Sequence, residues 1–273
     1  MSLSAPAIRA RKRRNGSAPL VMVTAYDEPG ARYVDAAGVD LILVGDSLAN
    51  VVLGHPDTLH VTIEQMCYHV KAVSAAKPQA HIVADLPWLS YHVGIADSVR
   101  NGAALIRAGA HSVKLEGGRV RRDVVRALLD AEIPVMGHLG LTPQSVLTMG
   151  GFKVQAKTRE ASEWLIKDAA LLQDEGVYAI VIEGVPPVVG TRITEALEIP
   201  TIGIGAGPDT DGQVLVFHDI LGLTSREPAK FVRQYAQLGN EITEAIGRFA
   251  ADVRSGAFPD ESEVYPNPED LLN

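Results

Sequence analysis

One unit recurs along the chain: a helical pattern stops at a glycine or an acidic residue, a short apolar strand follows, and the strand opens into a polar or glycine turn. The spacing of the copies is irregular, so they indicate alternating strands and helices rather than a solenoid repeat. Counting them gives eight strands, expected at 20–25, 40–44, 80–84, 111–116, 133–138, 178–183, 200–204 and 213–217.

The helical segments are amphipathic, whereas the strands are apolar throughout. Val120, Val124 and Leu128 recur at the spacing of a helix with one buried face. Apolar strands between such helices are typical of a parallel sheet covered by helices. Eight strand–helix units in about 250 residues predict an α/β fold of the (β/α)8 TIM barrel type. An open doubly wound sheet is the alternative. No linker interrupts residues 1–273, so we expect a single domain.

Composition excludes several classes of function. The net charge of -8 argues against nucleic-acid binding, which usually needs a basic face. No apolar run approaches the ~20 residues of a membrane span. The single cysteine, Cys67, cannot form an internal disulfide and suits a reducing cytosol, so we expect a cytoplasmic protein. Cys67 falls on a helical pattern, which favours packing over a nucleophilic role.

The two ends of the chain differ in charge. Residues 1–18 are basic, and the first acidic residue is Asp27. The basic side chains are Arg9, Arg11, Lys12, Arg13 and Arg14. A transit peptide or an anion patch is conceivable, but there is no apolar leader and the first strand begins near residue 20, so we interpret 1–18 as a solvated segment. Residues 259–273 are rich in Pro, Asp and Glu and are expected to form a loose acidic tail.

Lys114 and Glu116 stand two residues apart in a strand that ends at a glycine turn. Side chains alternate along a strand, so both charges point to one side while Val113 and Leu115 point to the other. Lysine and glutamate are rarely buried unless paired. An ordinary structural Lys–Glu pair is one interpretation, and a catalytic pair at the carboxyl end of a parallel strand is the other.

Three carboxylates follow consecutive strands and favour the second interpretation. Asp46, Asp85 and Glu116 lie at the expected ends of strands two, three and four. The carboxyl ends of barrel strands meet at one face, where the active site is built. Oxygen ligands without cysteine suit a hard cation such as Mg²⁺. Three acids that merely cap the following helices would be the structural alternative.

Further polar residues end the later strands. Glu183 follows an entirely apolar strand, where desolvation would raise the pKa of a carboxylate towards the range of a general base. His138 could donate to a substrate or merely fill the barrel mouth. The glycine run 203–207 lacks the dinucleotide-binding spacing and is explained equally well by close backbone approach. A metal and a base at one mouth indicate enolisation of a small oxo acid.

Several runs resemble the ketopantoate hydroxymethyltransferase (3-methyl-2-oxobutanoate hydroxymethyltransferase) family. The resemblance extends from about residue 20 to residue 259, and together the runs are far more specific than any single motif. The matching segments are 23–27, 43–47, 84–87, 113–118, 137–145, 150–155, 202–207 and 211–213.

The resemblance implies transfer of a one-carbon unit from 5,10-methylenetetrahydrofolate to 3-methyl-2-oxobutanoate, which gives 2-dehydropantoate in pantothenate biosynthesis. It further implies that Mg²⁺ is the cofactor and that small-molecule 2-oxo acid and folate are the substrates. A large ring-like homo-oligomer, suspected to be a decamer, is implied as well. By resemblance the metal ligands are Asp46, Asp85 and Glu116, the substrate-binding residues are Asp46, Ser47, Asp85 and Lys114, and the catalytic base is Glu183.

The sequence departs from the family pattern at positions away from these residues. Ala49 and Ala156 replace usual glycines, His60 stands where proline is common, and Glu263 where histidine is frequent. Two other functions are alternatives. A Mg²⁺-dependent lyase or mutase of the isocitrate lyase type is one, although the chain lacks the Lys-Lys-Cys-Gly-His run of those lyases. A catalytically silent barrel is the other.

Overall fold

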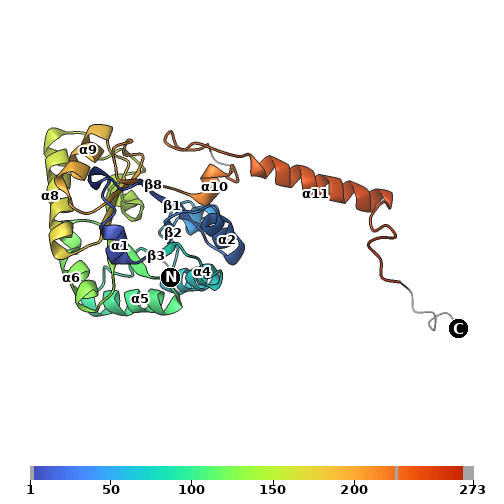
Figure 1. The fold of residues 1–273 in the computed structure, drawn as a ribbon, viewed down its shortest axis with the longest axis horizontal. Coiled ribbons are helices and arrows are strands. Elements are labelled where there is room, and N and C mark those ends of the chain that lie inside the picture. The colour runs from blue at the N-terminus through green and yellow to red at the C-terminus, as the bar shows by residue number, and fades with distance from the viewer. Residues whose placement is uncertain (1–2, 225–226, 267–273) are drawn as a thin grey trace. The chain divides into compact units, whose positions relative to one another are not determined.

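Eight parallel strands close into a barrel in the computed structural model, which describes residues 3–224 and 227–266 (Figure 1). Each strand pairs with its neighbours in chain order, and β1 pairs with β8, which excludes the open sheet. All eight expected strands are present, with bounds within two residues of the prediction. The strands are β1 Leu20–Thr24, β2 Leu41–Val44, β3 His81–Asp85, β4 Ser112–Glu116, β5 Val135–Gly140, β6 Ala179–Glu183, β7 Thr201–Ile204 and β8 Gly212–Leu215.

The longer helices between successive strands surround the barrel (Figure 1). The helices of the described residues are α1 Ala5–Arg9, α2 Glu28–Ala36, α3 Leu48–Val51, α4 Ile63–Ala75, α5 Ile95–Ala108, α6 Arg122–Asp130, α7 Val146–Met149, α8 Arg159–Glu175, α9 Pro187–Ala196, α10 Phe217–Ile220 and α11 Leu238–Ser255. Of these, α1 precedes the first strand, and α10 and α11 follow the last. Short 3-10 turns occupy η1 Arg13–Asn15, η2 Arg119–Arg121 and η3 Pro143–Ser145.

Local sequence signals set the helix ends. Thr62 and Gln65 form a reciprocal capping box at the start of α4, so two otherwise unpaired backbone donors are satisfied. Gly176 ends α8 at φ 110°, a backbone conformation that residues other than glycine rarely adopt. The predicted buried face of α6 is confirmed for Val124 and Leu128. It is wrong for Val120, which lies in η2 before the helix begins and is 74% exposed.

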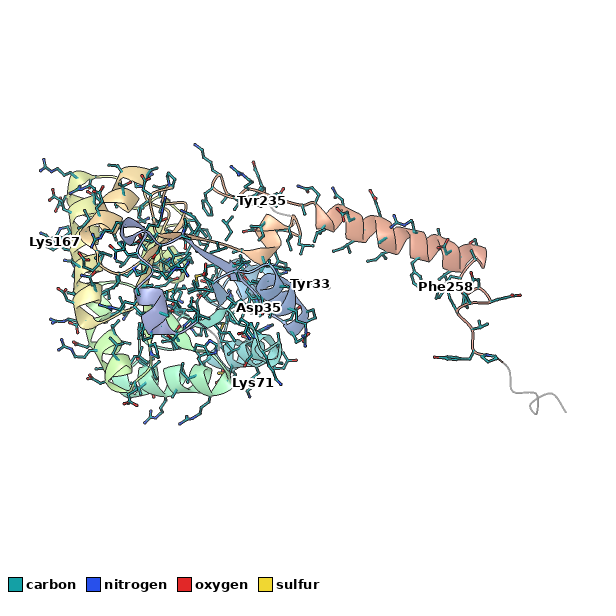
Figure 2. The ribbon with its side chains drawn as sticks, in the orientation of Figure 1. Tyr33, Asp35, Lys71, Lys167, Tyr235 and Phe258 are labelled. Carbon is teal, nitrogen blue, oxygen red and sulfur yellow. The ribbon has the colours of Figure 1, made fainter. Side chains whose placement is uncertain are left out.

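Strand side chains alternate between the barrel interior and the helical layer. Val113 and Leu115 of β4 pack in the outer apolar cluster, as predicted. Inward side chains change character along the barrel, and β3 shows the order: His81, then the apolar Val83, then Asp85. An apolar middle layer thus separates a polar end from a charged one. Outside the ring, Tyr33 of α2 is 70% exposed, and Figure 2 labels its position.

The N-terminal segment closes the polar end of the barrel. Ile8 of α1 is fully buried in the inner apolar cluster together with Leu20 and Met22. Arg9 donates to the carbonyl of Val177 at 2.7 Å. The Leu3 carbonyl lies 2.7 Å from His81 Nδ1, which donates to it. The prediction of a solvated leading segment is therefore wrong for Ala5, Ile8 and Lys12, which are buried.

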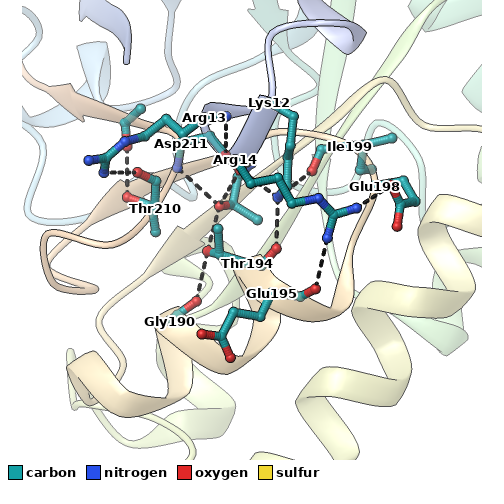
Figure 3. A network of polar contacts seen from close by, with 12 residues as sticks. Lys12, Arg13, Arg14, Gly190, Thr194, Glu195, Glu198, Ile199, Thr210 and Asp211 are labelled. Atoms are coloured by element: carbon teal, nitrogen blue, oxygen red, sulfur yellow. Dashed lines mark hydrogen bonds and ion pairs between the residues drawn. The ribbon is translucent and has the colours of Figure 1, made fainter. Parts of the chain in front are cut away.

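Lys12 ties this segment to the last third of the chain (Figure 3). Its side chain is only 2% exposed, and Nζ donates to the carbonyls of Thr194 at 2.7 Å and Ile199 at 3.1 Å. Its third bond, 2.7 Å long, goes to Asp211 Oδ2. Burial lowers the pKa of Lys12, and the Asp211 carboxylate opposes that change. A basic run in the sequence can therefore contain a buried lysine when all three ammonium hydrogens have acceptors.

Two compact units divide the chain. The first comprises the described residues up to Phe217 together with Ala229–Val232, and the second comprises the described residues of 218–228 and 233–266. Within the second unit, α11 buries no residue. Its apolar side chains Ile242, Ile246, Phe249 and Val253 are 48–61% exposed. The single-domain interpretation stays a prediction, and part of the expected acidic tail, 267–273, lies outside the described residues.

Within the described part of the chain, no helix has both the length and the apolar character needed to cross a membrane.

Replacing Lys12 by methionine should destabilise the protein strongly. The change leaves Asp211 buried without its cation, and breaking a buried ion pair on one side costs about 3–5 kcal/mol. Urea unfolding followed by circular dichroism measures the free energy. The matched control is Arg14→Met, which removes the exposed ion pair with Glu198 and should cost less than about 1 kcal/mol. Equal losses in the two variants would contradict this account.

Candidate active site

Strand register brings the predicted site residues together at the carboxyl end of the barrel. Asp85 is the direct partner of Lys114 across β3 and β4, and Glu116 is the partner of His138 across β4 and β5. Asp46 follows β2, and its backbone NH donates to Asp85 Oδ2 at 3.1 Å. Each of these five residues is at most 5% exposed. The site is therefore a buried charged layer.

Lys114 is the central cation of this layer. Its Nζ lies 2.8 Å from Asp85 Oδ1, so its closest partner is on the neighbouring strand and is not Glu116. Burial opposes a charge on Lys114, but Asp85, Glu116 and Asp46 outweigh burial and raise its pKa above the usual lysine value. The three carboxylates therefore favour the ammonium form of Lys114. The simple Lys–Glu pair considered from the sequence is replaced by a pair with Asp85.

His138 lies between two carboxylates. Nδ1 is 3.4 Å from Glu116 Oε1, and Nε2 is 3.1 Å from Glu183 Oε2. Burial and the Lys114 ammonium oppose a charge on the ring, but the bonds to Glu116 and Glu183 raise the pKa of His138 to about 9. The ring thus lies within ion-pair distance of both carboxylates, and Lys114 Nζ also approaches Nδ1 at 3.3 Å. His138 connects the base candidate Glu183 to the charged layer.

Asp46 is the least compensated carboxylate of the site. Burial, followed by repulsion from Asp85 and Glu116, raises its pKa well above the ordinary aspartate value. Gln144 Nε2 donates to Asp46 Oδ2 at 2.8 Å, which stabilises the ionised form in part. Ionised, the three carboxylates of the layer and Glu183 face only Lys114 and His138, so negative charge remains in excess.

The donor set fits a hard divalent cation in charge and in chemistry. The candidate ligands Asp46, Asp85 and Glu116 offer only oxygen, and a dication would neutralise the excess negative charge. Among the described residues, no three His, Cys, Asp or Glu side chains converge closely enough to form a metal cage. Mg²⁺ does not require one, because it is usually bound by one or two carboxylates and keeps waters or substrate oxygens.

Two functional candidates were not found from the sequence. Gln144 of η3 and Tyr91, in the loop after β3, are both buried, and the Tyr91 hydroxyl donates to Gln144 Oε1 at 2.7 Å. Both stand in loops without periodicity, and Gln144 lies inside the run 137–145 that resembles the family. A search for titratable residues at strand ends does not identify them, because neither carries a charge.

The structure also places the remaining residues that the sequence singled out. Ser47 Oγ lies 2.8 Å from the hydroxyl of Tyr26. Cys67 packs at the edge of the outer apolar cluster on α4, as predicted. In the glycine run, a Cβ at Gly205 would lie 2.8 Å from Phe231, which confirms the interpretation of close approach.

A sequence model of the ketopantoate hydroxymethyltransferase family matches residues 3–261. The 3-methyl-2-oxobutanoate hydroxymethyltransferase of Koribacter versatilis (strain Ellin345) is 54% identical over 253 residues, which cover 92% of this chain and 86% of that protein. The protein of the same name from Moorella thermoacetica is 51% identical, with 95% and 96% covered.

Solved structures with a similar fold are far more distant in sequence. A phosphonopyruvate hydrolase in complex with oxalate and Mg²⁺ has a TM-score of 0.63 at 12% identity, covering all of this chain and 94% of that one. A 2,3-dimethylmalate lyase, a member of the PEP mutase/isocitrate lyase superfamily, has a TM-score of 0.62 at 18% identity, with 97% and 93% covered. At such identities the similarity shows the barrel fold alone.

Replacing Asp46 by asparagine should stabilise the metal-free protein. The amide keeps an acceptor for Gln144 and removes the repulsion from Asp85 and Glu116, for a gain of about 1–2 kcal/mol. Thermal unfolding in EDTA at neutral pH measures the change, and the exposed Asp174→Asn should stay within about 0.5 kcal/mol of wild type. A lower melting temperature for Asp46→Asn would show that the carboxylate is fully compensated in the fold.

Proposed function

The chain belongs to the ketopantoate hydroxymethyltransferase family, and we propose that it transfers a hydroxymethyl group from 5,10-methylenetetrahydrofolate to 3-methyl-2-oxobutanoate. The product is 2-dehydropantoate, an intermediate of pantothenate biosynthesis. The observation that carries this proposal is the buried layer of carboxylates around Lys114 at the barrel mouth, in a chain more than 50% identical to transferases of that name.

In this proposal Asp46 and Asp85 hold Mg²⁺, and Glu116 contributes directly or through a water. The bound metal supplies Lewis-acid polarisation of the 2-oxo group. The structural support is the excess of buried oxygen ligands over cationic partners described above. The phosphonopyruvate hydrolase with a related fold contains Mg²⁺ and oxalate, which is itself a small dicarboxylate.

Lys114 and Ser47 orient the oxo acid. The Lys114 ammonium is fixed by Asp85 at 2.8 Å and can pair with the substrate carboxylate as well. Ser47 follows Asp46 directly in the chain, and its hydroxyl lies 2.8 Å from that of Tyr26. Asp46 and Asp85 also contact the substrate in this arrangement. A substrate bound between these groups has its C3 hydrogen available to a base from another strand.

Glu183 is the proposed base. It ends β6, and its side chain is 15% exposed, more open than the carboxylates of the charged layer. His138 Nε2 lies 3.1 Å from Glu183 Oε2, within ion-pair distance of the carboxylate. Glu183 removes the C3 proton, and the resulting enolate forms a C–C bond to the methylene carbon of the folate. The two C–N bonds that hold this carbon break, and water supplies the oxygen of the new hydroxymethyl group. The C3 proton and one proton of the water pass to the two folate nitrogens, and tetrahydrofolate leaves.

A homo-oligomer, ring-like and decameric by resemblance, is part of the proposal. The exposed apolar stripe of α11, which includes Ile246 and Phe249, supports self-association, since such a stripe is typical of a helix that packs on a partner. We expect a cytoplasmic enzyme that binds neither nucleic acid nor a membrane.

The two alternatives are less well supported. The similarity to lyases and mutases of the isocitrate lyase type rests on 12–18% identity, and the only cysteine lies on α4, away from the strand ends. In a catalytically silent barrel, the buried carboxylates around Lys114 would serve no function. Their mutual repulsion destabilises the fold, which argues against this alternative.

A turnover assay tests the proposed function. Purified protein with 3-methyl-2-oxobutanoate, 5,10-methylenetetrahydrofolate and Mg²⁺ should form 2-dehydropantoate, detected by mass spectrometry. Phosphonopyruvate and 2,3-dimethylmalate serve as competing substrates. Cleavage of either, with no 2-dehydropantoate formed, would assign the chain to the alternative chemistry.

Removal of the metal should abolish turnover reversibly. Excess EDTA should stop the reaction, and added Mg²⁺ or Mn²⁺ should restore it. Asp85→Asn should weaken metal affinity because it removes one negative ligand, and calorimetric titration measures that loss. Exposed Asp174→Asn is the control and should bind metal like wild type. Full activity in EDTA would remove the metal from the scheme.

Glu183→Gln should lower turnover while leaving substrate binding nearly unchanged. The amide keeps the shape of the side chain but cannot accept the C3 proton, so the rate should fall by about 10²–10⁴. Exchange of the C3 hydrogen in D₂O reports this step directly by NMR. Exposed Glu163→Gln is the matched control. Exchange at the wild-type rate in Glu183→Gln would transfer the role of base to another residue, with His138 the next candidate.

A further inference from the structure

Gln144 contacts two of the proposed metal-binding carboxylates at once. Its side-chain Nε2 donates to Asp46 Oδ2 at 2.8 Å, and its backbone NH donates to Glu116 Oε2 at 3.0 Å. These two carboxylates come from different strands, β2 and β4, whereas Gln144 belongs to the turn η3 after β5. One residue therefore fixes one oxygen atom on each of two ligands.

The orientation of the Gln144 amide is determined by its neighbours. Nε2 also donates to the carbonyl of Leu86 at 3.0 Å, and Oε1 accepts from the Tyr91 hydroxyl at 2.7 Å. A flipped amide would place Oε1 against the Asp46 carboxylate and the Leu86 carbonyl, both of which are acceptors. The buried network consequently allows one orientation, in which a donor faces Asp46.

Tyr91 completes the network from the loop after β3. It is 1% exposed, and its hydroxyl accepts from the backbone NH of Glu116 at 3.2 Å. The hydroxyl has one hydrogen, and Gln144 Oε1 at 2.7 Å is closer than the Glu116 carbonyl at 3.4 Å. Tyr91 therefore donates to Gln144, and the order of donation runs from Tyr91 through Gln144 to Asp46.

We propose that Gln144 and Tyr91 are positioning residues that hold Asp46 and Glu116 in the orientation required to bind a divalent cation. This inference rests on the proposed function, because it assigns the carboxylates to a metal. Neither residue acts on the substrate in this scheme; both act through the carboxylates. Hydrogen-bond partners of metal ligands fix ligand geometry, and their loss typically weakens metal affinity or activity about 10–100-fold.

Mn²⁺ affinity provides a readout that is independent of turnover. Electron paramagnetic resonance of free Mn²⁺ gives the dissociation constant of wild type, Gln144→Leu, Tyr91→Phe and the double variant. Gln144→Leu keeps the backbone bond to Glu116 and should weaken binding about 10–100-fold. Tyr91→Phe should weaken binding by a smaller factor. In the double variant, affinity should match Gln144→Leu within about twofold, since Tyr91 reaches a ligand carboxylate only through Gln144 and contacts Glu116 at its backbone NH.

Matched controls separate positioning from general stability. Tyr178→Phe removes a buried hydroxyl at the opposite end of the barrel, and Gln173→Leu removes an amide that accepts from the backbone NH of Glu198. Both should bind Mn²⁺ like wild type. Tyr91→Phe, which keeps the ring in place, carries the test alone if Gln144→Leu does not fold.

The outcomes distinguish this inference from the function on which it rests. Wild-type affinity in Gln144→Leu or in Tyr91→Phe would overturn it, and so would additive losses in the double variant or equal losses in the controls. A wild-type protein that binds no Mn²⁺ would instead overturn the metal site of the proposed function, and this inference with it.

Discussion

The ammonium of Lys114 makes the charged mouth of this barrel possible. Asp46, Asp85 and Glu116 are almost completely buried, and buried carboxylates that lack a cation repel one another at a cost of several kcal/mol. Lys114 lies 2.8 Å from Asp85, and all three acids help to keep it charged against the effect of burial. The compensation is incomplete, as the raised pKa of Asp46 shows. The fold thus maintains an excess of buried negative charge at the position where chemistry is expected.

The apolar middle layer of the barrel strengthens the repulsion between these carboxylates. Val83 and Met136 separate the charged layer from the polar end, and α1 closes that end with Ile8. The carboxylates therefore lie next to an apolar layer, which keeps the effective dielectric constant on that side low. Charges interact more strongly in such surroundings than at a surface. Helix α1 at one end of the barrel therefore contributes to the electrostatics of the charged layer at the other end.

The sequence was sufficient to predict the barrel, its eight strands and the charged residues at their ends, because βα alternation and polar strand ends are local patterns. The sequence did not reveal which side chains pair with one another. Lys114 pairs with Asp85 because β3 and β4 have a particular register, which the sequence does not encode locally. Tyr91 and Gln144 are placed by loop packing, and uncharged loop residues carry no periodic signal. Lys12 was misjudged since its acceptors lie about 180 to 200 residues later. Long-range contacts were the common source of error.

The bond between Lys12 and Asp211 also constrains the order in which a growing chain can fold. The two residues are 199 positions apart, so Lys12 leaves the ribosome long before its partner is made. At the usual 5–20 residues per second this interval lasts about 10–40 s. During that time α1 has no finished barrel to enter, and the nascent strands are open at the end that it will close. The first segment to be synthesised is therefore among the last to reach its place.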